Sequence, residues 1–318
     1  MVSEGERLGQ FFKTQKEKFE KCLSPELTCP EKPINAHSIQ NARVLELLER
    51  NGHVVMPRQS TSKSGPEIQF VEVGRNQAST FTGLCSAHDS EIFRPIDTQE
   101  FDPGNKQHLF LIAYRSITRE LHAVLEGAFR IQTSYTWRVK AGLDPPDGPS
   151  PAGNEATAQM IKGWETWKYR HAHFDRAIEK GDWKSIRHNV LKLETQTTTI
   201  AVSALFSFDG VELNGDIVRC VLNVVPVSDD RTFVIFSYAK PDSQTARRNL
   251  RPILLRKGEQ QKYELSKLII ANIENFVIAP EWFDIWSEQK LKTVHDAFVS
   301  TLFDSREIQE SDELMLFT

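Results

Sequence analysis

The spacing of apolar residues changes along the chain, from a helical period to an alternating one and back. In the middle of the chain, apolar residues recur every three or four positions, which predicts long helices at 106–141 and 155–180. The proline-rich segment 142–154 separates them, so we expect an antiparallel helical pair. After Gly181 apolar and polar residues alternate, which predicts strands within 184–240 that form one antiparallel sheet.

In the rest of the chain the periodic apolar patterns are shorter. The pattern predicts helices at 4–22, 41–50, 243–255, 261–274 and 281–302, the start of a helix at 88–96, and strands after residue 51 and at 67–74. The acidic stretch 303–318 is expected to be loose. Four aromatic residues of the middle region are expected in the core: Trp164, Trp167, Phe174 and Trp183.

Composition narrows the class of protein. With 318 residues, 39% of them apolar and 26% charged, the chain is typical of a soluble globular protein with one large or two smaller domains. The net charge of −4 argues against a protein whose whole surface binds nucleic acid, although a local basic patch remains compatible with it. No apolar stretch approaches the roughly 18 residues of a membrane span. A membrane partner is therefore not expected.

The cysteines are clustered, and this changes the picture. The charged N-terminus lacks the apolar region of a secretion signal, so we expect a cytoplasmic location. In that reducing compartment, clustered cysteines are more often metal ligands than disulfides. Cys22 and Cys29 are separated by six residues, and Cys85 and His88 by two. Three thiolates and one imidazole would complete a tetrahedral zinc shell; the alternative is unrelated cysteines and a surface histidine.

The order of these residues resembles a nuclease family. A cysteine pair, then "AHSIQ" at 36–40, then "GLCSAHD" at 83–89 resembles the zinc-stapled HNH, or His-Me finger, nucleases. The resemblance covers about residues 20–100. The same region is similar to the N-terminal part of a bacterial protein group without an assigned activity, through "AHSI", "GHV" and "ASTFTGLCSAHD".

The resemblance implies a metal-dependent endonuclease that hydrolyses phosphodiesters, with a role in bacterial defence against phage. It places His37 as the general base and Asp89 as the ligand of a catalytic magnesium or manganese ion, completed by Asp97, Glu91 or water. It places Cys22, Cys29, Cys85 and His88 on a structural zinc. We expect Asn76, Ser79 or Thr80 to orient the ring of His37. Nucleic acid would then be the partner.

A second function stays open. Ala36 stands where many members of the family have an acidic metal ligand, and Gln40 where proline is usual. His37 is then a structural residue hydrogen-bonded to the backbone, or itself a zinc ligand. The chain would be a non-catalytic, zinc-stabilised binding or sensor protein that recognises a protein partner or a second copy. A nuclease needs His37 and Asp89 at one open cavity, whereas a binding protein would bury His37 against the backbone.

These observations predict an α+β fold. We expect a treble-clef, HNH-like zinc module at 1–104, the helical pair at 105–183, and an antiparallel sheet flanked by helices at 184–318.

Three further features carry weaker signals. His171 and Asp175 lie four residues apart on one helical face, which indicates a metal pair or, more simply, a solvated charged face. "TARRNLRPILLRK" at 245–257 holds five basic residues, which suit either phosphate contacts or a solubilising surface helix. Cys220 lies in an apolar strand and is expected to be an inert buried thiol.

Overall fold

The structure is a computed structural model that describes residues 17–62, 65–147, 150–208, 217–303 and 308–318. Contacts divide the chain into two compact units, which are described separately. Unit 1 contains Met1–Ala36, Phe81–Glu91 and Ile117–Lys180; unit 2 contains His37–Thr80, Ile92–Ser116 and Gly181–Thr318. The ranges 1–104, 105–183 and 184–318 remain a prediction about which segments fold independently.

Unit 2 is built on a seven-stranded sheet in the order β3-β2-β9-β6-β7-β8-β5. All neighbouring strands are antiparallel, as expected for the region after Gly181. The strands are β2 (His53–Ser62), β3 (Gly65–Gly74), β5 (Ile186–Glu194), β6 (Ile200–Ser207), β7 (Arg219–Ser228), β8 (Arg231–Ala239) and β9 (Phe276–Ile278). The α+β class is confirmed.

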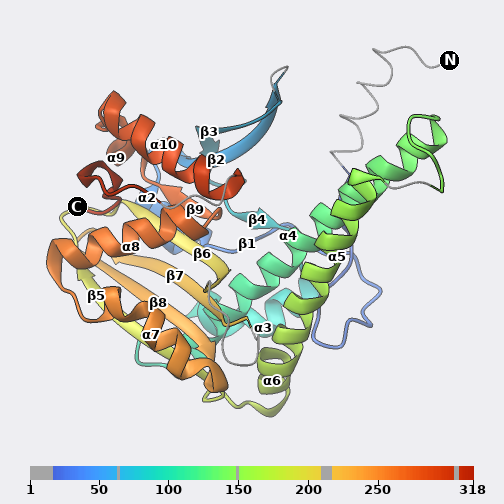
Figure 1. Ribbon diagram of the computed structural model, residues 1–318. Helices are drawn as coiled ribbons and strands as arrows, with labels where there is room; N and C mark the ends of the chain where they lie inside the picture. Colours follow the sequence, from blue (N-terminus) through green and yellow to red (C-terminus); the bar gives the residue numbers. More distant parts are fainter. Residues whose placement is uncertain (1–16, 63–64, 148–149, 209–216, 304–307) are drawn as a thin grey trace. The chain divides into compact units, whose positions relative to one another are not determined.

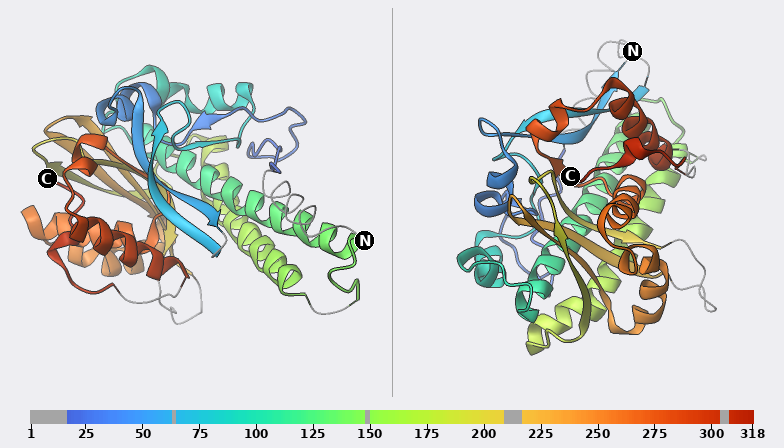
Figure 2. Two further views of the ribbon diagram at one scale, coloured as in Figure 1. Left: turned by 90° about the horizontal axis from the view of Figure 1, so that it is seen from above. Right: turned by 90° about the vertical axis from the view of Figure 1, so that its left-hand side faces the viewer.

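Three of these strands lie outside the region in which the sequence predicts the sheet. The β2–β3 hairpin, expected in the N-terminal module, joins the sheet through β9. Figure 2 shows this hairpin as two long blue strands. Strand β9 in turn pairs with β6, from Ile200 opposite Ile278 to Val202 opposite Phe276. It was not predicted, because three apolar residues are too few to display a period.

Both faces of the central strands are covered. Along β6, Ile200, Val202 and Ala204 belong to one apolar cluster, whereas Ala201 belongs to another. Strand β9 alternates in the same way, with Val277 in the second cluster. This alternation is the period of two that a strand imposes, and it places one core on each side of the sheet.

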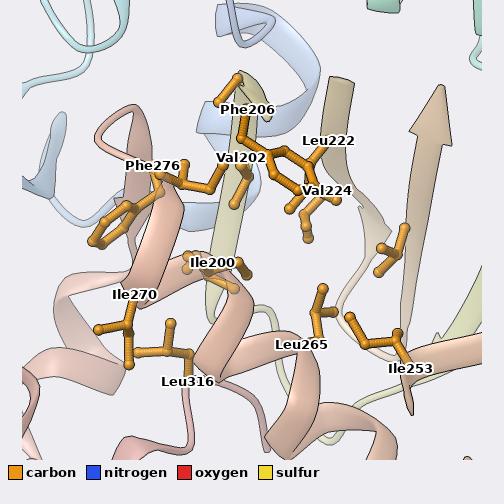
Figure 3. Packing of buried hydrophobic residues seen from close by; sticks show 14 of the residues in the cluster. Ile200, Val202, Phe206, Leu222, Val224, Ile253, Leu265, Ile270, Phe276 and Leu316 are labelled. Atoms are coloured by element: carbon orange, nitrogen blue, oxygen red, sulfur yellow. The ribbon is translucent and has the colours of Figure 1, made fainter. Parts of the chain in front are cut away.

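Helices supply the other half of each core. Figure 3 shows Ile253 and Leu265 packed against the sheet residues Val202 and Val224. They lie on α7 (Ser243–Leu254) and α8 (Gly258–Asn272), and α10 (Glu288–Phe303) contacts α8. The second cluster includes Leu45 and Leu48, from the short helical segments η1 (Asn41–Leu45) and α2 (Glu46–Leu48). Short elements η3 (Lys240–Asp242), α9 (Pro280–Asp284) and η4 (Asp312–Leu314) complete the unit.

The last residues of the chain are packed, which corrects the expectation that 303–318 is loose, although residues 304–307 lie outside the described residues. Leu314, Leu316 and Phe317 are at most 2% exposed and belong to the main core of unit 2 (Figure 3 labels Leu316). Lys262 Nζ donates a hydrogen bond to the carbonyl oxygen of Thr318 at 2.6 Å. The many acidic residues of this stretch drew attention away from its short apolar segment. Burying these apolar side chains is favourable, because leaving them exposed to water costs free energy.

Unit 1 contains the predicted helical pair. Helix α4 (Lys106–Lys140), of which Ile117–Lys140 belong to unit 1, lies beside α5 (Pro151–Arg170) (Figure 1). Gly163 of α5 faces Leu125 of α4, and a Cβ there would lie 3.0 Å from Leu125 Cδ2. Gly153 faces Tyr135 in the same way, so the helices run antiparallel at close approach. The short segments η2 (His171–Asp175) and α6 (Arg176–Lys180) follow α5.

Two expectations for unit 1 are wrong in part. Of the helix expected at 4–22, residues 4–16 lie outside the described residues, and residues 17–22 are not helical. Among the expected core aromatics Phe174 is fully buried, but Trp164 is 58% exposed. Helix α5 carries apolar residues on more than one face, and the helical period does not show which face packs.

Candidate metal centre

The four predicted zinc ligands lie together in unit 1. Within the described residues, the ligand atoms of Cys22, Cys29, Cys85 and His88 all lie within 4.8 Å of one another. The sulfurs of Cys29 and Cys85 are 3.9 Å apart. Nδ1 of His88 lies 3.2 Å from the sulfur of Cys85 and 3.6 Å from that of Cys22.

These distances suit a tetrahedral ion. With Zn–S near 2.3 Å and Zn–N near 2.0 Å, the edges of the tetrahedron are about 3.8 Å between sulfurs and about 3.5 Å between sulfur and nitrogen. The observed separations match these edges within a few tenths of an ångström. The donor set and its geometry therefore fit zinc.

Backbone hydrogen bonds bring the ligand segments together. The N–H of Cys85 donates to the sulfur of Cys22 at 3.3 Å. The N–H of Leu23 donates to the carbonyl of Gly83 at 2.7 Å, and that of Ile34 to the carbonyl of Leu84 at 2.8 Å. His88 follows in the first turn of α3 (Ser86–Thr98), so one short turn carries two of the ligands.

The cysteines differ in their acidity. Burial raises the pKa of the Cys22 thiol. Burial also raises the pKa of Cys85, but hydrogen bonds from the backbone and side chain of His88, and from Cys22 and Cys29, lower it to about 7. A thiol with this pKa is partly ionised at neutral pH, and an ion bound here would favour the thiolates further.

Four protein ligands close the coordination shell. Catalytic zinc sites usually keep one position for water or substrate, whereas structural sites fill all four positions with Cys or His. The group Cys22, Cys29, Cys85 and His88 can therefore hold a structural zinc ion. No other group of three or more potential ligands occurs within the described residues.

His37, the predicted general base, contacts the backbone. It lies at the end of β1 (Ala36–His37), which pairs with β4 (Thr80–Phe81) in a small two-stranded sheet. Its side chain is half-buried, and Nε2 donates to the carbonyl of Arg75 at 3.2 Å. Burial lowers its pKa, the Arg75 carbonyl opposes this, and the guanidinium groups of Arg115 and Arg75 lower it further. The imidazole is therefore neutral at pH 7.

The residues expected to orient His37 form other hydrogen bonds. The side chain of Asn76 accepts from Asn41 Nδ2 at 2.9 Å, and the Ser79 hydroxyl accepts from the N–H of Ile39 at 3.3 Å. The Thr80 hydroxyl donates to the carbonyl of Gln77 at 3.0 Å. The ring of His37 is held instead by a main-chain carbonyl.

Asp89 and His37 belong to different units. Asp89 lies in unit 1, where its N–H donates to the carbonyl of Cys85 at 2.9 Å, and His37 lies in unit 2. Asp97, considered as a further ligand, accepts a hydrogen bond from Arg115 Nη2 at 2.7 Å. A shared catalytic site of His37 and Asp89, with magnesium or manganese, therefore remains a prediction.

The pair His171 and Asp175 does not form a solvated face. Asp175 is fully buried, and its Oδ1 lies 3.3 Å from Nε of Arg170, which is also fully buried. Nδ1 of His171 lies 3.7 Å from the other carboxylate oxygen. A buried charge needs a partner of opposite sign, and Arg170 supplies it.

The basic segment 245–257 covers most of α7 and the turn that follows it, and its apolar and basic side chains lie on different faces. Leu250 and Ile253 are buried, whereas all five basic side chains are exposed. They are Arg247, Arg248, Arg251, Arg256 and Lys257. Arg256 forms an ion pair with Glu264 of α8.

Sequence reasoning missed a group of buried polar residues in unit 2. Ser203 and Asn223 lie in the middle of β6 and β7 and are almost fully buried. Arg115 of α4 is 5% exposed. The available signal was a serine and an asparagine inside otherwise apolar strands. Cys220, on the same strand as Asn223, is fully buried, and burial raises its pKa well above the usual value, as an inert thiol requires.

Comparisons with known proteins found no match to a family model, a curated protein or a solved structure. Within the described part of the chain, no helix combines the length and the apolar character needed to cross a bilayer.

Proposed function

We propose that the chain is a zinc-stabilised binding protein in which the zinc ion is structural. The closed set of three cysteines and one histidine carries this proposal, because it provides four protein ligands at tetrahedral distances. The hydrogen bond from His37 to the carbonyl of Arg75 also supports it, since a binding protein is expected to hold this histidine against the backbone.

The exposed arginines of α7 indicate the chemistry of the partner. Arg247, Arg248 and Arg251 lie at positions i, i+1 and i+4, so they share one face of the helix. Their exposure supports contact with a polyanion, and we propose nucleic acid. The net charge of −4 restricts such binding to a local patch.

Two measurements test this function. Elemental analysis of protein purified without added metal should give about one zinc per chain, and less than a tenth of that for Cys85→Ser. Fluorescence anisotropy with labelled duplex DNA, single-stranded DNA and RNA should detect binding that weakens with salt. Replacing the three arginines of α7 by alanine should reduce the slope of log K against log salt by about three for duplex DNA.

A variant that loses three positive charges outside α7 controls for the change in net charge. Arg94, Lys162 and Lys168 are exposed and lie on α3 and α5. Their triple alanine variant changes the net charge equally and should leave the salt slope unchanged. If no nucleic acid binds, or if both triple variants weaken binding equally, the proposed partner is wrong.

A second candidate is the HNH-like endonuclease, supported by the state of His37. Because Nε2 donates to a carbonyl, Nδ1 is the nitrogen that accepts a proton, and the lowered pKa keeps the ring neutral at pH 7. A neutral imidazole with a fixed tautomer suits a general base. In this candidate Asp89 binds the catalytic magnesium or manganese ion.

Variants separate the two candidates. An assay of duplex DNA, single-stranded DNA and RNA with magnesium or manganese should show cleavage if the chain is a nuclease. His37→Ala should then reduce the rate by about 10²–10⁴-fold while zinc content stays unchanged. Asp89→Ala should reduce the rate without unfolding. If the wild-type protein cleaves none of these substrates, or if His37→Ala retains full activity, the nuclease candidate is wrong.

A further inference from the structure

Unit 2 contains a small cavity that lies apart from the predicted zinc ligands. Its volume is about 30 Å³, and residues of β6, β7, α4 and the segment after β1 line it. Most of the lining is apolar. The polar residues in its wall are Ser38, Gln40, Arg115, Ser203 and Asn223.

Two buried N–H groups at this cavity lack a protein acceptor. Arg115 is 5% exposed and Asn223 is 4% exposed. Among the described residues, neither Nε of Arg115 nor Nδ2 of Asn223 has a hydrogen-bond partner. Leaving a buried donor unpaired costs about 1–3 kcal/mol, and more for a charged group, so two such groups in one cavity point to a ligand that accepts hydrogen bonds.

The neighbouring hydroxyls are already paired with one another. The Ser116 hydroxyl, which has one proton to donate, lies 2.9 Å from Oδ1 of Asn223, 3.0 Å from the carbonyl oxygen of Ile112 and 2.8 Å from the hydroxyl of Ser203. The Ser38 hydroxyl donates to the carbonyl of Ser79 at 3.0 Å and accepts from Asn275 Nδ2 at 3.0 Å. In this arrangement Oδ1 of Asn223 faces the Ser116 hydroxyl, and Nδ2 is the amide donor that has no partner among the described residues.

Arg115 is held in place from two sides. Nη2 donates to Oδ2 of Asp97 at 2.7 Å, and the guanidinium carbon lies 4.1 Å from the centre of the Phe93 ring. The side chain of Asp97 is 40% exposed, so its charge is partly screened by solvent. The wall of the cavity therefore has two N–H donors, one of them on the cation Arg115 and the other on the neutral amide of Asn223, which suits an anion.

The size of the cavity limits the ligand. One water molecule needs roughly 10–15 Å³ of such volume, so the cavity has room for about two atoms of that size. A halide ion or the carboxylate of formate fits this space, whereas a phosphate ester or a nucleotide does not.

We propose that this cavity is a binding site for a small monovalent anion, a halide or a small carboxylate, held by Arg115 Nε and Asn223 Nδ2. The site belongs to unit 2 alone and rests on neither the zinc ligands nor His37.

Thermal unfolding tests the proposal. The full-length protein is compared in potassium bromide, potassium formate and potassium gluconate at constant ionic strength, because gluconate carries the same charge but is too large. At a concentration about tenfold above the dissociation constant, bromide or formate should raise the midpoint by about 3 °C relative to gluconate. Asn223→Asp keeps the acceptor for Ser116 and replaces the donor by a carboxylate oxygen, so the difference should disappear.

Two further variants and a crystal complete the test. Asn223→Leu removes the donor without adding charge and should also abolish the difference, while Asn249→Asp on α7 should keep it. Crystals grown in bromide should show an anomalous peak beside Arg115 Nε and Asn223 Nδ2. Equal midpoints in bromide, formate and gluconate for the wild-type protein, or water alone at this position, would overturn the proposal.

Discussion

The segment that carries the first two cysteines and the sheet of unit 2 are ordered by different forces. Residues 17–35 contain no helix or strand, and their order depends on a few backbone hydrogen bonds and on the groups around Cys22 and Cys29. The sheet, in contrast, has an apolar cluster on each face. An irregular segment buries too little apolar surface to offset its loss of entropy, and a metal ion can supply the difference.

The contrast teaches that the two regions should respond to different perturbations. Loss of the metal ligands should affect the cysteine segment and spare the sheet. Loss of apolar side chains should destabilise the sheet and spare the metal. The predictions below test this division, from the largest expected effect to the smallest.

Removal of the zinc should have the largest effect. Structural zinc contributes apparent binding energies of about 10–16 kcal/mol in small zinc-binding peptides, so its loss should unfold residues 17–35 and the turn 81–91. Cys85→Ser or treatment with a strong chelator should therefore abolish hydrogen-exchange protection in these two segments. The amides of β6, β7 and β8 should keep most of their protection.

The fourth cysteine offers a matched control for this experiment. Cys220 is fully buried in β7 and does not belong to the metal group. Cys220→Ala should leave zinc content unchanged and cost about 1 kcal/mol through a small cavity. Equal loss of protection in the cysteine segment for Cys85→Ser and Cys220→Ala would contradict the division.

A cavity in the sheet core should have the next largest effect. Phe276 of β9 is fully buried and contacts the rings of Phe70 and Phe298, at centroid distances of 6.2 and 5.7 Å. Phe276→Ala should lower the free energy of unfolding by about 3–5 kcal/mol in urea titrations, with zinc content unchanged. Val190→Ala, at a 36% exposed position of β5, should cost less than about 1 kcal/mol. Similar costs for both variants would argue against β9 as a core strand.

Acid should weaken unit 2 through His188. Burial lowers its pKa from 6.5 to about 4, and Nδ1 lies within hydrogen-bond distance of the Ser237 hydroxyl, at 2.8 Å. As the pH falls from 6.5 towards 4, the unfolded chain binds a proton at this residue before the folded protein does, so stability decreases across this window. The loss is at most about 3 kcal/mol. His188→Asn should flatten urea stability between pH 6.5 and 4, and an unchanged slope would contradict the burial of this ring.

The smallest effect is expected at Trp164. This side chain is 58% exposed, and its ring lies tilted against that of Trp167 at a centroid distance of 4.7 Å. Trp164→Ala should change the free energy of unfolding by less than about 1 kcal/mol, whereas Phe174→Ala, at a fully buried position, should cost about 3–5 kcal/mol. A larger effect at Trp164 than at Phe174 would show that the exposed face of α5 is covered in solution.

Spacing along the sequence was sufficient to find the four residues that could hold a metal ion. Cys85 and His88 lie on one turn, so their two-residue gap is a local property that the sequence displays directly. The period of two likewise revealed β5 to β8, and the period of 3.6 revealed α4 and α5. For His37 the sequence left a general base, a backbone-bonded structural residue and a zinc ligand open, because the Arg75 carbonyl that its ring contacts is a main-chain group and leaves no mark in the sequence.

Other features depend on contacts between distant segments. Strand β9 has three residues and is recognisable only beside β2 and β6. Residues 314–317 follow acidic residues, so the sequence alone predicts a loose tail. Their burial becomes evident only from the core residues that they contact. The two unpaired donors of Arg115 and Asn223 arise because helix α4 and strand β7 meet, and neither segment alone indicates it.

The central place of β9 constrains the order in which the molecule can be made. The β2–β3 hairpin at 53–74 reaches the rest of the sheet only through Phe276–Ile278, about two hundred residues later in the chain. Contacts of such sequence separation slow folding, because a long loop must close before they form. On the ribosome, where domains generally begin to fold during synthesis, the hairpin is complete long before its partner emerges. Until then the edge of β2 stays unpaired, and an unpaired strand edge can pair with another chain.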